Sequence, residues 1–433
     1  MKKLLFVWAA LFCITLWGCS WEPAHRHTFG DWTIKESPTC AKVGSEERIC
    51  AECQETETRP IAKLPHDLNA NNICKTCKYV DFDPDGEFAE LGVFSNNWYT
   101  NTNSKANHVW DVKVWGNMVY RGAGDYDINA GTTPFLAFNK DTQCWEKPGN
   151  SDDQAIQRFV EIGGKLYAPG IDANGSWALG NFYVLEGDTW TQVRNLPNGL
   201  HNFDMIEFDG KIFAGLGTET VGNTVAVSAD GGKTFQFLPL YQDGKCIDTA
   251  AYQYSRTYEF AAYGGKLYAL VVFQSNSSSK YMIFRYEEDK MVYQGPAKGL
   301  LGGTGYNRNF WSGKLEKDGI CYLTADSLFA ITDFADNSTW KRVVMPQDER
   351  VIDALLYDGV MYVLCGLPLA DNKGYTTIIY QSATGTEGSF TEVVRYDYPS
   401  APCSFDYDGT HFYIGTGGSV DAAKIGMLLR VKA

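Results

Sequence analysis

From residue 110 onward the chain repeats one pattern of hydrophobic and polar positions. A short apolar run rich in β-branched and aromatic residues is followed by a tight turn, usually Gly-Gly or Asp-Gly, and then by a second apolar run. Turns of this kind join neighbouring antiparallel strands. Seven copies occur, 40 to 55 residues apart, with turn residues Asn117, Gly164, Gly210, Gly265, Gly319, Gly359 and Gly409.

A second signature follows the turn in most copies. It is a polar-aromatic-polar strand, centred on Trp145, Trp190, Phe235, Trp340 and Phe390. Units of about 50 residues with four strands each are typical of β-propellers. The last unit ends after a third strand, at 428–433, and the segment 97–100 around Trp98 matches the missing fourth strand. We therefore predict an all-β, seven-bladed propeller over residues 88–433, whose last blade is completed by an N-terminal strand.

One unit carries a recognisable turn motif, Ser228-Ala-Asp230-Gly-Gly232-Lys-Thr234-Phe235. It resembles the Asp-box of sialidase-like and related propellers. The resemblance implies a hairpin in which Ser228 and Asp230 satisfy backbone groups of the turn. Because this motif is structural, it supports the fold and says nothing about chemistry.

The N-terminal residues have the pattern of a targeting signal. Lys2 and Lys3 precede an apolar run over 4–17, which is too short for a comfortable membrane span and typical of a secretory signal. The run ends in Gly18-Cys19, which resembles the lipobox of bacterial lipoproteins. The resemblance implies a signal peptide over 1–18, lipidation of Cys19 and a linker over 19–24. An ordinary signal peptide is the alternative.

Residues 25–80 form a predicted Cys-rich module that is too poor in large apolar side chains to fold without cross-links. Cys50-x2-Cys53 and Cys74-x2-Cys77 are separated by 20 residues, the spacing of a zinc ribbon. Cys40 and His66 are alternative ligands for the same Zn²⁺, and His27 is a further available imidazole. Disulfides are the competing interpretation, because an exported protein meets an oxidising environment.

The sequence of this module resembles a short Cys-rich repeat of bacterial cell-surface proteins. The resemblance rests on His27-Thr-Phe29-Gly-Asp-Trp32, Pro38-Thr-Cys40, Cys50-x2-Cys53 and the shorter unit that begins at His66. Lys78 departs from it, because Gly is usual after the last cysteine. The resemblance implies an extracytoplasmic spacer or docking module.

Candidate functional positions come from aligning the seven units. Counting back nine and six residues from each turn residue selects two sets of equivalent positions, and many of them are polar. We expect the side chains of these two polar rows to lie together at one end of the propeller channel. The rows contain His108, Asp111, Arg158, His201, Asp204, Arg256, Glu259, Arg350 and Asp353, and Arg308 falls just out of register. Such a cluster suits an anionic or hydroxyl-rich ligand. Inter-blade ion pairs, such as Arg158 with Asp204 or Asp111, are an equally good interpretation.

The charge composition and the motifs of the chain limit the classes of function that it can have. The chain has 38 Lys and Arg against 52 Asp and Glu, a net charge of −14, which argues against nucleic acid as a partner. A sialidase-like glycoside hydrolase acting on an anionic sugar would need an Arg triad, for which Arg256, Arg308 and Arg350 are the candidates. The Arg-Ile-Pro phrase of that family is missing, so we assign no catalytic residue. We expect a lipid-anchored envelope protein, at the outer membrane or cell surface, whose propeller binds a carbohydrate or protein ligand.

Overall fold

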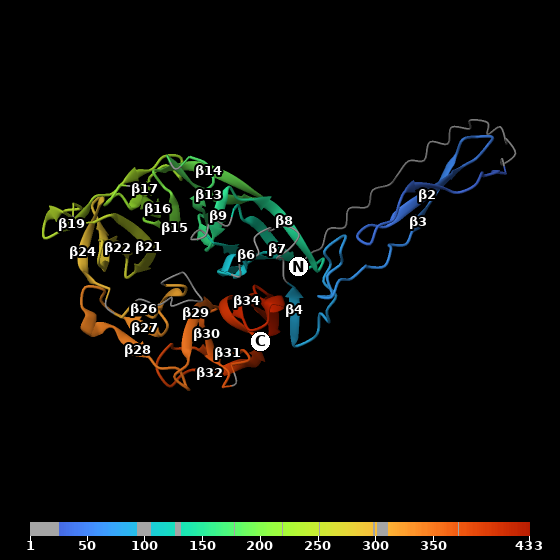
Figure 1. Ribbon diagram of the computed structural model, residues 1–433. Coiled ribbons are helices and arrows are strands. Elements are labelled where there is room, and N and C mark those ends of the chain that lie inside the picture. Colours follow the sequence, from blue (N-terminus) through green and yellow to red (C-terminus); the bar gives the residue numbers. More distant parts are fainter. Residues whose placement is uncertain are drawn as a thin grey trace, which may run out of the picture. The chain divides into compact units, whose positions relative to one another are not determined.

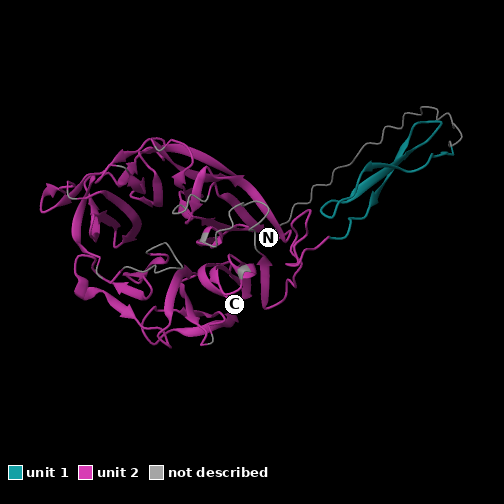
Figure 2. Ribbon diagram, in the orientation of Figure 1, with its two compact units in different colours: residues 1–66 teal, residues 67–433 magenta. Residues whose placement is uncertain are grey.

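The computed structural model describes residues 26–92, 105–125, 131–176, 178–218, 220–250, 252–297, 299–300, 311–370 and 372–433. The chain divides into two compact units, residues 1–66 and 67–433 (Figure 2). We call them unit 1 and unit 2. The predicted Cys-rich module therefore contributes residues to both, because the segment from Asp67 to residue 80 belongs to unit 2.

Unit 1 is a three-stranded antiparallel sheet of strands β1 (Thr33–Glu36), β2 (Gly44–Ile49) and β3 (Thr56–Ile61), in that order. Its strands are held by charged and aromatic side chains. Arg48 pairs with Glu57 across β2 and β3, and the guanidinium of Arg59 lies 4.2 Å from the centre of the Trp32 ring. Such contacts stabilise a sheet modestly and bury little apolar surface.

Unit 2 contains seven four-stranded antiparallel blades within its described residues, arranged as a ring in Figure 1. Four blades are separate sheets, and short additional strands join the other three, blades 1, 3 and 4, into one 16-stranded sheet. Blades 1 to 4 are β5 (Asp111–Trp115), β6 (Met118–Gly124), β7 (Pro134–Asn139) and β8 (Cys144–Asn150); β10 (Val160–Ile162), β11 (Lys165–Pro169), β13 (Leu179–Glu186) and β14 (Thr189–Pro197); β15 (His201–Phe208), β16 (Lys211–Thr218), β17 (Val225–Ser228) and β18 (Gln236–Phe237); and β21 (Tyr254–Tyr263), β22 (Lys266–Gln274), β23 (Ser279–Glu287) and β24 (Lys290–Pro296).

The remaining blades follow the same order. Blades 5 to 7 are β25 (Lys314–Lys317), β26 (Ile320–Thr324), β27 (Leu328–Ile331) and β28 (Lys341–Val343); β29 (Arg350–Tyr357), β30 (Val360–Pro368), β31 (Tyr375–Ser382) and β32 (Thr391–Tyr398); and β33 (Ser400–Tyr407), β34 (His411–Ser419), β35 (Leu428–Lys432) and β4 (Phe88–Gly92). The predicted seven-bladed propeller is confirmed.

Short additional elements join or extend the blades. Strands β9 (Asp153–Ile156) and β12 (Ile171–Ala173) connect β6 of blade 1 to β15 of blade 3, and β16 pairs directly with β21 of blade 4. A hairpin of β19 (Leu240–Gln242) and β20 (Lys245–Cys246) adds a parallel pair to β24. Three 3-10 turns, η1 (Lys105–Asn107), η2 (Asn337–Thr339) and η3 (Ala422–Lys424), lie in the described loops.

The predicted hairpin chemistry explains how each blade begins. In blades 2 to 6 both central turn residues have positive φ, as in Asp209 (50°) and Gly210 (68°). This is the type I′ geometry that matches the twist of two paired strands. The Gly-Gly and Asp-Gly pairs are therefore needed at these positions, because other residues adopt positive φ only at a cost.

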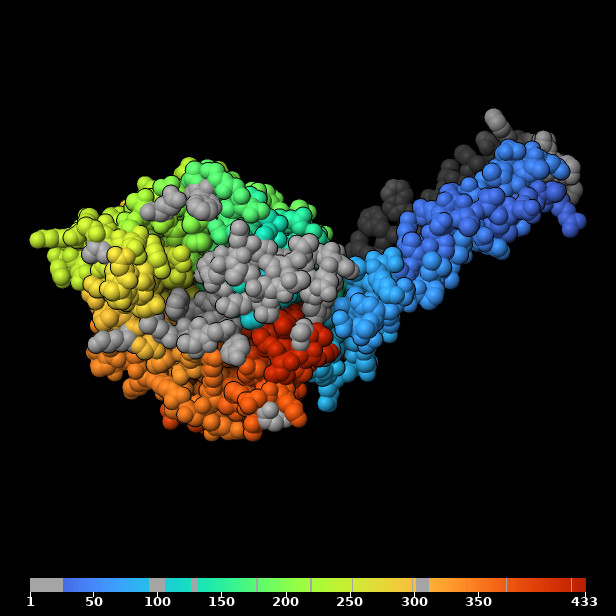
Figure 3. Space-filling model, viewed as in Figure 1, coloured from blue at the N-terminus to red at the C-terminus, as the bar shows by residue number. Residues whose placement is uncertain are grey.

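The ring is closed by pairing between the two ends of unit 2. Strand β4 pairs antiparallel with β35, so that Leu429 lies opposite Glu90. In Figure 3 the red C-terminal strands adjoin the light-blue residues that precede blade 1. The closing strand is thus Phe88–Gly92, upstream of the predicted segment around Trp98, which lies outside the described residues.

Between blades, buried aromatic rings fill the core. Trp190 of blade 2, one of the predicted polar-aromatic-polar positions, stacks on Phe135 of blade 1 with ring centres 4.4 Å apart. The Asp-box of blade 3 also forms as its resemblance implies. Asp230 accepts hydrogen bonds from the backbone N–H of Thr234 (2.9 Å) and from its hydroxyl (2.7 Å), and Ser228 Oγ accepts from the N–H of Gly232 (2.8 Å).

Candidate functional site

Acidic side chains on the innermost strands tie five of the seven blades to the next blade around the ring. In each case a carboxylate accepts a hydrogen bond from a backbone N–H of the neighbouring blade. The pairs are Asp111 with Phe159 (2.6 Å), Asp204 with Phe260 (2.8 Å), Glu259 with Trp311 (3.3 Å), Asp353 with Phe405 (3.4 Å) and Asp406 with Val114 (2.8 Å). Four of these acids belong to the predicted polar row, and the structure gives them a shared structural role.

Three predicted residues form a buried ion cluster in the channel together with Lys314. Arg158 Nη1 lies 2.6 Å from Glu259 Oε2 and 3.2 Å from Asp204 Oδ2. Lys314 Nζ lies 2.5 Å from Asp204 Oδ2 and 3.3 Å from Glu259 Oε2. Two cations thus face two carboxylates, so the inter-blade ion pair between Arg158 and Asp204 that the sequence suggested is present. Buried charges are tolerated only with such partners.

The pKa values of the two carboxyls move in opposite directions. Burial alone raises the pKa of Asp204, but Arg158 and Lys314 outweigh it and hold this pKa below its usual range. For Glu259, burial outweighs the same two cations and raises the pKa. The cluster therefore keeps Asp204 ionised and makes Glu259 the carboxyl that takes up a proton first.

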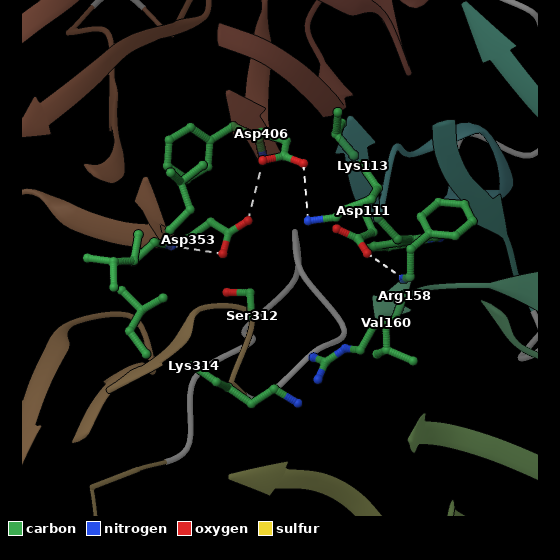
Figure 4. Close-up of a pocket in the computed structure, with 16 residues that line it drawn as sticks. Asp111, Lys113, Arg158, Val160, Ser312, Lys314, Asp353 and Asp406 are labelled. Atoms are coloured by element: carbon green, nitrogen blue, oxygen red, sulfur yellow. Dashed lines mark hydrogen bonds and ion pairs between the residues drawn. The ribbon is translucent and has the colours of Figure 1, made fainter. Parts of the chain in front are cut away.

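A cavity of about 340 Å³ lies beside this cluster, between blades 1, 2, 5, 6 and 7. Figure 4 shows Asp111, Asp353 and Asp406 on one side of it, with Arg158 and Lys314 on the other. Lys113 Nζ lies 3.5 Å from Asp406 Oδ2, and Ser312 and the rings of Trp110, Phe159 and Phe405 complete the polar and aromatic lining.

Burial dominates the protonation of two cavity carboxyls. It raises the pKa of Asp111 to about 7, against the lowering effects of the Phe159 N–H and Arg158. It also raises the pKa of Asp353 well above the ordinary value, and the nearby charge of Asp111 adds to the effect. Near neutral pH these groups can therefore both accept and donate hydrogen bonds.

His201 and Arg256 meet at the start of strands β15 and β21. Arg256 Nη2 lies 3.5 Å from His201 Nε2, and Arg256 Nη1 donates to the hydroxyl of Tyr258 (3.2 Å). The guanidinium also lies 4.7 Å from the ring centre of Tyr254. Burial and the Arg256 charge lower the pKa of His201 to about 3, so this imidazole is neutral at physiological pH.

The other predicted residues that the structure describes belong neither to the ion cluster nor to the cavity lining. His108 is buried with its ring 4.9 Å from that of Trp110, and Arg350 forms an ion pair with Asp326 at 2.6 Å. Arg308 and Cys19 lie outside the described residues. The structure therefore brings together Arg158, Asp204 and Glu259 in one cluster, Asp111 and Asp353 in the cavity, and His201 with Arg256.

Three charged residues of the cavity were not among the predicted ones: Lys113, Lys314 and Asp406. Lys314 follows Gly313, the residue that the six-residue count selects in the fifth unit, so one position of register hid it. Asp406 was missed because it lies three residues before the turn residue Gly409, whereas the two counts select the positions six and nine residues before it. A search for acids close to every turn, rather than at one fixed offset, would have found it.

The predicted zinc ligands belong to different units. Cys50 and Cys53, with Cys40 and His66, lie in unit 1, whereas Cys74 and Cys77 lie in unit 2, so the four-cysteine set remains a prediction. Within unit 1, ligand atoms of His27, Cys50 and Cys53 all lie within 4.8 Å of one another, an arrangement compatible with metal binding.

Among the described residues, no helix has the length and apolar character needed to cross a membrane. No known family profile matches the chain, and no curated protein matches it.

Several solved structures of propellers and polysaccharide-cleaving enzymes are similar in part. YCF48 bound to a D1 peptide shares 13% identity over 83% of this chain and 100% of that one, with a TM-score of 0.46. A PL25 ulvan lyase bound to a sugar shares 14% over 80% and 95%, with a TM-score of 0.45. The WD40 β-propeller domain of Doa1 shares 12% over 80% and 96%, with a TM-score of 0.44. At these values the likenesses carry no conclusion about what this chain binds.

Proposed function

We propose that this chain is a cell-envelope lipoprotein, anchored through lipid on Cys19, whose propeller binds a carbohydrate without cleaving it. The cavity beside Asp111 is the proposed binding site. The signal and lipobox pattern of residues 1–19 supports the location, and the cavity supports the binding.

The observation that carries the proposal is the mixed lining of this cavity. Its volume of about 340 Å³ falls at the lower end of the range of small-ligand sites. Asp353 and Asp406 offer acceptors, Lys113 and Lys314 offer donors, and Trp110 adds an aromatic wall. Sugar hydroxyls both donate and accept, so they match a site that presents both kinds of group around apolar rings.

The carboxyl groups of Asp353 and Asp406 are held by backbone hydrogen bonds, which favours ligand binding over catalysis. Asp353 accepts from the N–H groups of Ala354 and Phe405, and Asp406 accepts from those of Val114 and Tyr407. Acceptors fixed by the backbone lose little conformational freedom when a ligand arrives.

A glycoside hydrolase is the second candidate, favoured by one observation. The pKa of Asp111 is raised to about 7 by burial, which is the condition of a general acid at neutral pH. The arginine triad of a sialidase receives no such support. Arg350 is paired with Asp326, and Arg256 is engaged with Tyr258 and faces His201.

The test is calorimetric titration of the mature protein with neutral and uronic-acid-containing oligosaccharides, combined with a reducing-end assay on the same mixtures. We expect saturable binding of a neutral glycan, weakened about tenfold by Lys113→Met, because Lys113 lines the cavity outside the buried ion cluster. Lys341→Met, on the exposed edge of blade 5, is the matched control and should leave the affinity unchanged. New reducing ends would support the hydrolase instead, and binding that ignores Lys113→Met would exclude this cavity.

A further inference from the structure

Unit 1 lacks the apolar core that a domain of its size needs. Of its described residues, 26–66, the buried ones are Cys40, Gly44 and Cys50. Two of these three are cysteines, whereas Ile34 and Ile49 are exposed. A segment of about 40 residues normally requires a disulfide or a metal ion to hold a unique fold.

Two of the three candidate ligand atoms in unit 1 are already spaced as a metal would space them. Cys53 Sγ lies 3.3 Å from His27 Nδ1, and the Cys50 thiol is within 4.8 Å of both. A tetrahedral zinc ion with its usual bond lengths to sulfur and nitrogen separates those two ligands by about 3.5 Å. The observed distance is close to this value.

The backbone around the two cysteines turns so that both thiols face one point. The N–H of Gln54 donates to the carbonyl of Cys50 (3.0 Å), and the N–H of Cys50 donates to the carbonyl of Glu55 (2.8 Å). Gln54 has a positive φ of 63°, which lets the N–H of Glu55 donate to the Cys53 sulfur.

The second Cys-x2-Cys pair, in unit 2, has the same turn. The N–H of Lys78 donates to the carbonyl of Cys74 (3.0 Å), the N–H of Cys74 donates to the carbonyl of Tyr79 (2.7 Å), and Lys78 has a φ of 64°. Two segments of different sequence thus share one backbone conformation, although neither carries the glycine that this conformation favours. A common conformation kept against that cost indicates a common task for the paired thiols.

Glu55 orients the imidazole of unit 1. Its Oε2 lies 3.0 Å from His27 Nε2, so the proton of the ring is held on Nε2 and the lone pair of Nδ1 faces Cys53. A carboxylate behind a histidine is the usual outer partner of a metal-bound imidazole.

We propose that His27, Cys50 and Cys53 bind one soft divalent cation of the Zn²⁺ class, with Glu55 as the positioning residue. The cation would be held by two thiolates and one neutral imidazole, and its fourth position would be taken by water or by a ligand from outside these three residues. Binding releases the two thiol protons to solvent and changes no oxidation state. The ion would supply unit 1 with the cross-link that its missing core does not.

The test uses the full mature chain with Cys74→Ser and Cys77→Ser, so that the second cysteine pair contributes no signal. Titration with Co²⁺ should give thiolate-to-cobalt charge-transfer bands and the visible bands of a tetrahedral ion, saturating at one equivalent. Cys53→Ser should abolish these bands. His27→Gln and Glu55→Gln should weaken Co²⁺ binding at least tenfold, the latter with the thiolates intact.

Glu36→Gln is the control, because this exposed carboxylate of β1 is remote from the ligand set in sequence and should leave binding unchanged. Glu55→Gln also keeps the proposal testable if the cysteine variants do not fold. The proposal is overturned if His27→Gln leaves the Co²⁺ affinity unchanged. It is equally overturned if mass spectrometry of alkylated protein from the cell envelope finds Cys50 and Cys53 joined as a disulfide.

Discussion

Asp406 in the seventh blade accepts a hydrogen bond from the backbone N–H of Val114 in the first blade, at 2.8 Å. This bond lies where the ring closes, and it repeats the chemistry that Asp353 uses toward Phe405 between blades 6 and 7. The last junction therefore resembles four of the other junctions on the inner side, while β4 completes it from the outer side.

Removing this carboxylate should weaken the closed ring. Asp406→Ala leaves the Val114 N–H without its acceptor, which typically costs about 1–3 kcal/mol. Urea unfolding should show that loss, and Asp188→Ala, at an exposed hairpin turn of blade 2, should show almost none. Equal stability of the two variants would mean that the inner contact does not help to close the ring.

The buried ion cluster should be much more sensitive than the exposed ion pairs of unit 2. Arg158→Met leaves Asp204 and Glu259 sharing one cation, Lys314, and breaking a buried pair in this way costs about 3–5 kcal/mol. Lys165→Met removes an exposed pair with Glu186 and should cost well under 1 kcal/mol. A small loss for Arg158→Met in denaturant unfolding would contradict the assigned role.

Asp111 should make stability fall as pH rises through neutrality. Its pKa is about 7 in the folded protein, mainly through burial, and near 4 when unfolded, so the folded state binds the proton more tightly between these values. The carboxyl then contributes a loss of about 1.4 kcal/mol between roughly pH 6 and pH 8. Asp111→Asn should remove this part of the slope in thermal or urea unfolding, while its amide oxygen still accepts from Phe159. An unchanged slope would place the titration elsewhere.

Lys78 sits in a backbone conformation that suits glycine. With φ at 64°, Lys78→Gly should stabilise the turn by about 0.5–1 kcal/mol, because glycine adopts this region without a steric cost. Lys75→Gly, in the same turn but without a positive φ, should destabilise it. Hydrogen exchange of the amides between Cys74 and Val80 measures both effects, and a gain for Lys75→Gly as well would attribute the change to something other than φ.

The number of blades could be predicted because each blade contains a tight turn with its own local sequence signature. Turns such as Asp209-Gly210 require positive φ, so their residues can be recognised without knowing the fold. The Asp-box at Ser228 is equally local. Closure was harder, because β4 is identified by its pairing with β35, more than 300 residues away, and the aromatic signature at Trp98 pointed to a different segment.

The candidate site was predictable only in part. Arg158, Asp204 and Glu259 could be aligned across units, but their mutual pairing depends on how the blades converge in the channel. Lys314 completes the cluster from a position that a fixed offset misses, and Asp406 lies closer to its turn than either offset reaches. Burial, which raises the pKa of Asp111, is a property of the assembled ring and leaves no mark on the sequence.

Glycan binding at the cavity, without turnover, is the central claim, and a structure of the mature protein soaked with the tightest-binding neutral oligosaccharide tests it most directly. The account predicts an intact sugar whose hydroxyls contact Lys113 and at least one of Asp353 and Asp406. A sugar bound elsewhere on the propeller, or a cleaved product in the cavity, would contradict it.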